Sequence, residues 1–237
     1  MALSNILILS QIAGHVIILT LSMCIIIPML NHVNDFNGHC LLFTTGTWSE
    51  VNGLFDIKWG SKFFCNFTII TGFFLFLVST IEIYRMSRLA LKKLDSSFLG
   101  LFLDALLGVI SCIMAFGSAI MITLGFITWC SRMTLRFPSC ETAAGQNITK
   151  QEEFVNTSGF YFDMGIAQFG AWSTFAGSVG LTVFAILKLV SDHQLRNMRA
   201  SMYLERQRLV HDDIFGGDDR MSDPPISNDL PEPDASQ

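Results

Sequence analysis

The fold of this 237-residue chain is decided by apolar stretches such as ALLGVISCIMAFGSAIMITLGFITWCS, residues 105–131, which contains no Asp, Glu, Lys or Arg. Three further stretches without these residues occupy 1–34, 63–81 and 164–187. A helix of about 20 residues crosses a hydrocarbon core roughly 30 Å thick, so each stretch is long enough to span a membrane. With 51% hydrophobic and 15% charged residues, the composition excludes a soluble monomer.

The sequence therefore predicts an all-α membrane protein, an antiparallel four-helix transmembrane bundle with spans at about 6–30, 64–84, 98–129 and 164–190. No basic segment precedes the first span, which is longer than a signal-peptide core, so we interpret it as a retained signal anchor. We assign residues 1–211 to the membrane domain, including a basic helical extension after the fourth span. Residues 212–237 contain eight acidic residues and four prolines, and we predict a disordered acidic tail there.

Basic residues are distributed unevenly around these spans. Ten Lys and Arg residues lie between the second and third spans or after the fourth, whereas five lie in the other two loops. Because Lys and Arg in short loops favour the cytosolic side, both termini are predicted to be cytosolic and the two long loops to face outward. We expect an integral multi-pass protein in the lipid bilayer of the plasma membrane or of a secretory-pathway or vesicle membrane.

Disulfide and glycosylation signals agree with this orientation. Four cysteines fall in or beside the two outward loops, where oxidising conditions allow disulfides: Cys40, Cys65, Cys130 and Cys140. We prefer the pairs Cys40–Cys65 and Cys130–Cys140, each within one loop, and pairing across the loops is the alternative. Asn147 and Asn156 stand in Asn-X-Ser/Thr sequons of the third loop, so we predict a glycoprotein with these two candidate sites.

The first outward loop is predicted to form a small extracellular β-sheet. Phe55, Ile57 and Trp59 alternate with polar residues, which is the pattern of a strand with one covered face. Residues 40–45 are also rich in strand formers. A lone hairpin is only marginally stable, so this disulfide-tied sheet is expected to lean on the helix ends or on a partner. Trp48 and Trp59 are candidate partner-binding residues in this loop.

Small residues recur at helical spacing in two of the spans. They are Ser111, Ala115 and Ala119 in the third span, and Ser173, Ala176, Gly177 and Gly180 in the fourth. Such rows let helix backbones approach closely, either within this bundle or against another membrane protein. Under the second interpretation the candidate partner-binding residues of the fourth span are Gln168, Trp172, Gly177 and Gly180, although Gln168 also suits an interhelical hydrogen bond.

Three ionisable residues lie inside the predicted spans: His15, Glu82 and Asp104. Charged groups in a membrane are costly and are therefore functional candidates. Glu82 and Asp104 are expected at similar depth near the inner face, where they can share a proton or a cation. The structural alternative pairs Glu82 with Arg85, pairs Asp104 with a base of the short loop or near Lys188, and makes His15 an interhelical hydrogen-bond partner.

No motif for catalysis or cofactor binding stands in the sequence. It lacks metal-ligand spacing, a Ser/His/Asp set, a phosphate-binding loop and a dinucleotide fingerprint. We therefore predict that the protein is not an enzyme and has no cofactor, metal, nucleic-acid partner or small-molecule substrate.

Four motifs occur in order along the chain: CLLFT at 40–44 with Gly46 and Trp48, GF and WC within 125–130, SCE at 139–141, and IAQFG followed by Trp at 166–172. In this combination the chain resembles the transmembrane protein 179 family over roughly residues 1–195. The resemblance implies a four-span membrane protein with cytosolic termini, and it implies no established enzymatic activity.

A weaker likeness is to the claudin and channel gamma-subunit tetraspans. Their first loop forms a disulfide-tied sheet with a Trp, Gly-Leu-Trp, Cys, Cys pattern. Here Gly53-Leu54 is followed by Phe55, and Cys40 precedes Trp48. This likeness implies the shared architecture but not tight-junction sealing, since fold analogy alone does not deliver function.

We weigh three functions from the sequence. The leading hypothesis is a non-enzymatic accessory or organising subunit that binds another integral membrane protein, a channel or receptor, and affects its trafficking or gating. The first alternative is a claudin-like adhesion or membrane-organising protein. The second is a proton or ion conductor that uses Glu82, Asp104 and His15.

Overall fold

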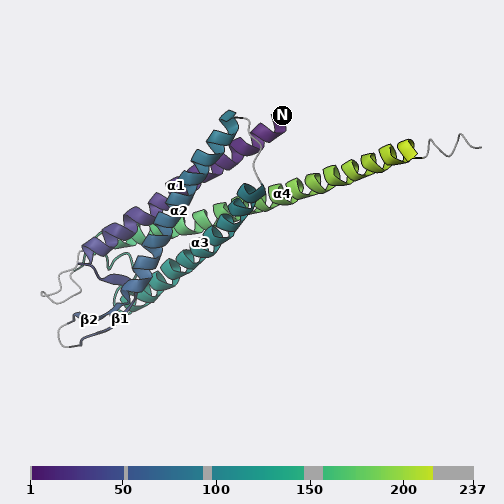
Figure 1. The fold of residues 1–237 in the computed structure, drawn as a ribbon. Helices are drawn as coiled ribbons and strands as arrows, with labels where there is room; N and C mark the ends of the chain where they lie inside the picture. Colours follow the sequence, from purple (N-terminus) through teal and green to yellow (C-terminus); the bar gives the residue numbers. More distant parts are fainter. Residues whose placement is uncertain (1, 51–52, 93–97, 147–156, 216–237) are drawn as a thin grey trace, which may run out of the picture. The chain divides into compact units, whose positions relative to one another are not determined.

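The computed structural model describes residues 2–50, 53–92, 98–146 and 157–215 (Figure 1). Its elements in chain order are α1 (Ala2–Asp35), β1 (Cys40–Trp48), β2 (Phe55–Gly60), α2 (Lys62–Lys92), α3 (Phe98–Met133) and α4 (Phe160–Phe215). The chain divides into two compact units, Met1–Leu189 and Val190–Gln237. The first unit contains the bundle and the sheet.

The described part of the chain contains four helices long and apolar enough to cross a membrane: Ile8–Asp35, Lys62–Leu91, Phe98–Met133 and Phe160–Leu209. The predicted number and order of spans are confirmed. The helices run past the predicted spans because backbone hydrogen bonding continues through polar flanking residues. Helix α4 continues to Phe215, beyond the predicted start of the tail at 212, and residues 216–237 lie outside the described residues.

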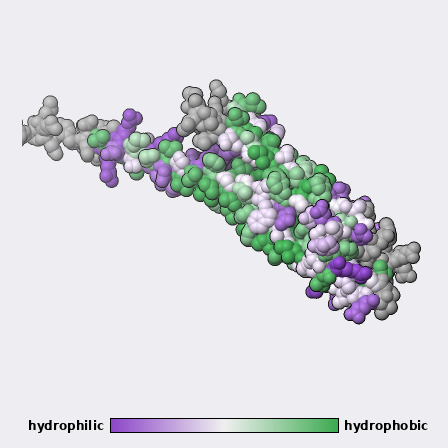
Figure 2. All heavy atoms as spheres, turned by 180° about the vertical axis from the view of Figure 1, so that it is seen from behind, coloured by the Kyte–Doolittle hydropathy of each residue, from purple (hydrophilic) through white to green (hydrophobic). Residues whose placement is uncertain are grey.

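Successive helices of the first unit run in opposite directions, with both strands at one end of the bundle (Figure 1). We call this the sheet end and the opposite end, near Lys92 and Phe98, the far end. Figure 2 shows a largely hydrophobic surface over the helices. Leu77 and Ile113, for example, are 57% and 66% exposed. A surface of this kind suits contact with lipid rather than water.

The two strands pair antiparallel, with Thr45 opposite Lys58 and Trp48 opposite Phe55. The predicted alternation in β2 is confirmed, because its apolar residues are covered while its polar residues are exposed. The register shifts between Cys40 and Thr45, where Phe43 adopts a positive φ of 61°. The Thr44 hydroxyl spans this irregularity, donating to the Cys40 carbonyl at 2.8 Å and accepting the Gly60 N–H at 3.0 Å.

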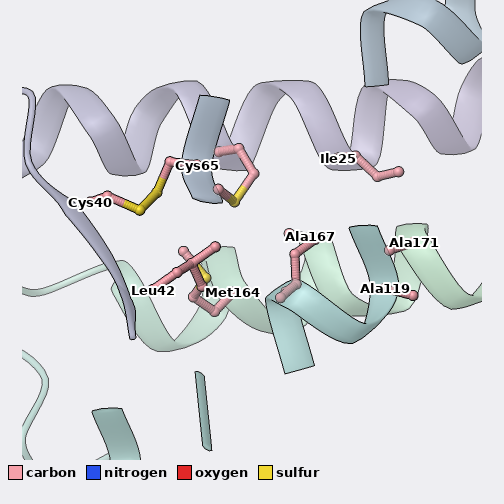
Figure 3. Packing of buried hydrophobic residues seen from close by; sticks show 10 residues of the cluster. Ile25, Cys40, Leu42, Cys65, Ala119, Met164, Ala167 and Ala171 are labelled. Carbon is pink, nitrogen blue, oxygen red and sulfur yellow. A yellow bond between two sulfur atoms is a disulfide. The ribbon is translucent and has the colours of Figure 1, made fainter. Parts of the chain in front are cut away.

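One hydrophobic cluster joins the helices to the first strand. Ile25 of α1 points towards the small residues Ala119, Ala167 and Ala171 of α3 and α4 (Figure 3). These alanines are fully buried, and their small size allows the helices to approach closely. The row in α3 predicted from sequence therefore packs inside this protein.

The disulfides join Cys40 to Cys65 and Cys130 to Cys140, the pairing preferred from the sequence. The Cα atoms of the first pair are 5.8 Å apart, and this bond ties β1 to the start of α2. The second pair, with Cα atoms 5.2 Å apart, ties α3 to the loop that follows it. The first disulfide thus anchors the β1 strand of the hairpin covalently to helix α2.

A second, mainly aromatic cluster supports the sheet from the helix ends. Trp129 of α3 lies in its centre, 1% exposed, with edge-to-face contacts to Phe55 of β2 and Phe160 of α4. Leu42 of β1 lies against Gly125, where a Cβ would come within 2.8 Å of the Leu42 Cβ. The sheet leans on the helix ends, which is one of the two supports expected for it.

In the second unit, the described residues continue the helix of α4. Arg196, which is exposed, pairs at 2.7 Å with the partly buried Asp192 one turn earlier. Leu195, Met198 and Met202 are also exposed. The predicted basic extension is therefore helical.

Candidate functional site

Two carboxylates share one guanidinium in the far half of the bundle. Glu82 and Arg85 lie one turn apart on α2, and the Arg85 Nη2 atom is 2.8 Å from Glu82 Oε2. The same Nη2 atom contacts Asp104 Oδ1 of α3, and Nη1 donates to the Gly100 carbonyl at 3.2 Å. Glu82 and Asp104 thus lie at similar depth, and the basic partner of Asp104 is Arg85, a residue after the predicted second span that the structure places within α2.

These acids line a small cavity between the four helices, whose lining is mostly apolar with several polar groups. Its volume is about 40 Å³, and its polar lining comprises Gln11 and His15 of α1, Ser79 and Glu82 of α2, Asp104 and Ser111 of α3, and Ser178 of α4. The three ionisable residues singled out in the sequence therefore meet at one cavity. A space of more than about 10–15 Å³ with two to four polar partners can hold a water molecule, so this cavity has room for a few water-sized particles beside its polar groups.

The chemistry of this cavity is restricted by its size and ligands. An organic ligand of drug size requires several hundred Å³, on the order of ten times this volume. Among the described residues, no group of three or more His, Cys, Asp or Glu side chains is arranged to hold a metal ion. The groups that line this cavity can form hydrogen bonds, and they can bind a particle that neutralises a single charge.

A different surface lies on the membrane side of α4. Gly165, Phe169, Trp172, Ala176 and Gly180 are spaced by three or four residues, and we call them the α4 face. All five are exposed, and a Cβ at either glycine would meet no atom within 4 Å. This face is apolar, and the described residues of the bundle leave it uncovered.

Polar contacts hold the aromatic part of this face in place. The Trp172 indole donates to the Thr123 hydroxyl of α3 at 3.1 Å, and the Gln168 side chain donates to the same hydroxyl at 3.2 Å. Phe116 packs edge-to-face with Trp172, with ring centroids 6.5 Å apart. Gln168 thus makes an interhelical hydrogen bond, which was the alternative to its role in partner binding. Trp172 is held by its hydrogen bond and is still 40% exposed.

The other glycine of the fourth-span row faces inward. A Cβ at Gly177 would lie 3.4 Å from Ile18 of α1, which is ordinary packing distance. Gly180 is exposed, as described above. Packing within this bundle, one interpretation of the fourth-span row, therefore applies to Gly177. The other interpretation, contact with another membrane protein, remains open to Gly180 on the exposed side of the same helix.

The two tryptophans of the first loop serve the sheet itself. Trp48 donates its indole N–H to the Arg132 carbonyl at 3.0 Å, and the Arg136 guanidinium lies 5.1 Å from its ring centroid. Trp59 stacks on His39 at 4.7 Å and meets Phe36 edge-to-face at 6.3 Å. Both side chains are partly covered, so their first role is to hold the hairpin.

Sequence reasoning missed several residues that build these regions. His32 is 1% exposed and its Nε2 atom accepts the Leu41 N–H at 3.2 Å, which joins α1 to β1. Thr123 and Arg136 join segments that are distant in sequence, the latter by donating to the Gly53 carbonyl at 2.6 Å. No periodicity or motif marks these residues. The candidate glycosylation sites at 147 and 156 lie outside the described residues.

Together, the four membrane-crossing helices, the antiparallel hairpin between the first two and the Cys40–Cys65 disulfide define a claudin-like multi-pass membrane protein. Its environment is a lipid bilayer, and this architecture supports a membrane-organising role. Residues 7–210 match the family model described as the Transmembrane protein 179/179B Claudin domain, so the chain belongs to this family. The match confirms the resemblance carried by the four sequence motifs. No solved structure matches the chain.

Proposed function

We propose that this protein is a non-enzymatic accessory or organising subunit that binds another integral membrane protein, a channel or receptor, and affects its trafficking or gating. In this proposal the termini are cytosolic, the hairpin faces outward and the α4 face forms the lateral contact. The observation that carries it is the exposure of Gly165, Ala176 and Gly180 on one side of an apolar helix, next to the anchored Trp172.

The energetics of helix contact in lipid support this assignment. Lipid tails are as apolar as the helix surface, so association depends on close packing and on hydrogen bonds rather than on the hydrophobic effect. Glycine costs a helix about 1 kcal/mol relative to alanine, and an exposed glycine recovers nothing from contacts within the bundle. A partner helix can approach closely at such positions. Trp172 adds a large side chain of fixed orientation, which is typical of residues that dominate binding.

Site-specific photocrosslinking in cells tests the proposal. A photoreactive amino acid at Ala176, on the α4 face, is expected to form a discrete adduct with another membrane protein. The matched control is the same amino acid at Leu77, which is 57% exposed on α2. Equal labelling from both positions, or gentle purification that never recovers a stoichiometric partner, contradicts the proposal.

Two variants separate loss of binding from loss of folding. Gly180→Leu fills the α4 face at a position where a Cβ meets no atom within 4 Å, so the bundle is expected to fold normally. Gly177→Leu instead meets Ile18 inside the bundle and is expected to lower stability. The proposal requires Gly180→Leu to abolish the Ala176 adduct while surface abundance and the disulfides remain as in the wild type.

A claudin-like adhesion role is the second candidate, and membership of a claudin-domain family favours it. Asp56 and Lys58 are the exposed residues of β2 and are the variants to use, because changing Trp48 or Trp59 would disturb the hairpin. Under this role, charge reversal at Asp56 and Lys58 disperses the protein from cell contacts. Unchanged enrichment at contacts contradicts adhesion through this surface.

Glycosylation tests the proposed orientation. Asn147 and Asn156 are expected to carry sugars, so glycosidase treatment should increase gel mobility and the double Asn→Gln variant should migrate like the treated protein. An epitope after Gln146 should be accessible on intact cells or on the luminal side of vesicles. Absence of sugar together with an epitope accessible only from the cytosol reverses the assigned faces.

A further inference from the structure

The cavity in the far half of the bundle carries an unbalanced charge. Arg85 contacts both Glu82 and Asp104, so one guanidinium faces two carboxylates. Among the residues that line the cavity, His15 of α1 is the only other side chain that can become positive, and α4 contributes Ser178 and apolar residues. With both carboxylates ionised and His15 neutral, the cluster carries one net negative charge in a membrane-spanning segment. Such a charge is strongly unfavourable unless it is neutralised.

Apart from Asp104 Oδ1, which contacts Arg85, two polar atoms of cavity-lining residues have no hydrogen-bond partner among the described residues. Ser178 is 3% exposed, lines the cavity, and its hydroxyl is unpaired. The Nδ1 atom of His15 is also buried and unpaired. Buried polar groups are normally satisfied by protein or by a bound particle, so these two atoms are available to a particle bound in the cavity.

The size of the cavity limits the occupant. A volume of about 40 Å³ admits a few water-sized particles and excludes an organic cation. Ca²⁺ takes six to eight oxygen ligands, usually including several carboxylates, whereas the described residues provide only two carboxylates here, both also engaged by Arg85. A monovalent cation the size of water satisfies both the volume and the charge.

We infer that this cavity binds one monovalent cation between Glu82 and Asp104, either a sodium ion or a proton taken up by one of the two carboxylates. The hydroxyl of Ser178 and the ring of His15 complete its surroundings, directly or through water. The occupant neutralises the cluster and links α2 to α3 at the level of Arg85. This inference concerns binding within the bundle and does not depend on the partner proposed for the α4 face.

Thermal unfolding of the full-length protein in lipid nanodiscs tests the inference and identifies the cation. In one arm, sodium replaces N-methylglucamine at constant ionic strength and pH; in the other, the pH is lowered at constant sodium. The unfolding midpoint is expected to rise by about 5 °C in one arm, since a ligand specific to the folded state stabilises it. A rise with sodium identifies a sodium ion, and a rise only with acid identifies a proton taken up by Glu82 or Asp104.

Charge-neutral variants show whether the effect arises at this cavity. Glu82→Gln and Asp104→Asn each leave Arg85 with one carboxylate, so each variant is expected to fold and to lose the dependence. Asp192→Asn removes a carboxylate that pairs with Arg196 outside the cavity, and this variant is expected to retain the dependence. His15→Gln is expected to weaken the dependence without abolishing it.

Three outcomes overturn the inference. The first is a wild-type midpoint that responds in neither arm. The second is an equal response in the wild type, Glu82→Gln and Asp104→Asn. The third is complete loss of the response in His15→Gln with both carboxylates intact, because a protonated imidazole would then be the balancing charge.

Discussion

Replacement of Arg85 by glutamine removes the one guanidinium shared by two carboxylates within the bundle. Glu82 is 4% exposed and the Asp104 side chain is 12% exposed, so neither acid gains full hydration when Arg85 is removed. Breaking a buried ion pair from one side costs about 3–5 kcal/mol. The Arg85 side chain is 31% exposed. We therefore expect a loss near the lower limit, about 3 kcal/mol in the free energy of unfolding.

The matched control is Arg88→Gln, one turn along the same helix. Arg88 is exposed and donates to the Tyr84 hydroxyl at 3.1 Å. An exposed substitution of this kind changes stability by about 0.5 kcal/mol or less. Both variants remove one positive charge from α2, so the difference between them isolates the effect of the buried carboxylates. Reversible unfolding by a denaturing detergent in mixed micelles measures both values.

A triple variant completes this test. Adding Glu82→Gln and Asp104→Asn to Arg85→Gln removes the charges left without a partner, and most of the lost stability should return. An Arg85→Gln variant as stable as Arg88→Gln would refute the reasoning. So would a triple variant that is less stable than Arg85→Gln alone, because burial of unpaired charge would then not be the cause.

Three further changes test contacts at the sheet end. Gly125→Val places side-chain atoms within 2.8 Å of Leu42. The variant should lose about 1–3 kcal/mol in the free energy of unfolding, measured by thermal unfolding. An unfolding midpoint equal to that of the wild type would show that the strand can shift freely. His32→Phe keeps an aromatic ring but removes the acceptor of the Leu41 N–H. The variant should lose about 1–3 kcal/mol in the free energy of unfolding and should accelerate hydrogen exchange at the Leu41 amide. Unchanged exchange at this amide would contradict the hydrogen bond. Arg136→Met removes the donor to the hairpin carbonyl and the charge over the indole ring, so exchange in the hairpin should increase with a loss of only about 0.5–1 kcal/mol. Exchange that increases equally throughout the bundle would argue against a local role.

Local patterns explain what could be predicted of the fold and site. Each span is a continuous apolar stretch, and the covered face of β2 follows from alternation within six residues. The pair Glu82–Arg85 follows from helical spacing, since residues three apart lie on the same side of a helix. The disulfide pairing was preferred because each bond closes within one loop. All of these inferences require only neighbouring residues or the order of the spans.

The remainder of the site depends on how each helix is rotated about its axis. That rotation brings Asp104 to Arg85, Thr123 to both Gln168 and Trp172, and Gly177 to the interior while Gly180 stays exposed. In a lipid environment all sides of a helix are apolar, so the hydrophobic pattern does not indicate which side faces its neighbours.

The sequence by itself determined that the chain has four segments able to cross a membrane, carries a hairpin after the first of them and resembles the transmembrane protein 179 family. Only the tertiary structure decided that His15, Glu82 and Asp104 line one cavity, and that Trp48 and Trp59 support the sheet. The physical reason is that membrane insertion is governed by the composition of single segments, whereas a cavity or an exposed face is produced by side-chain packing between segments far apart in the chain.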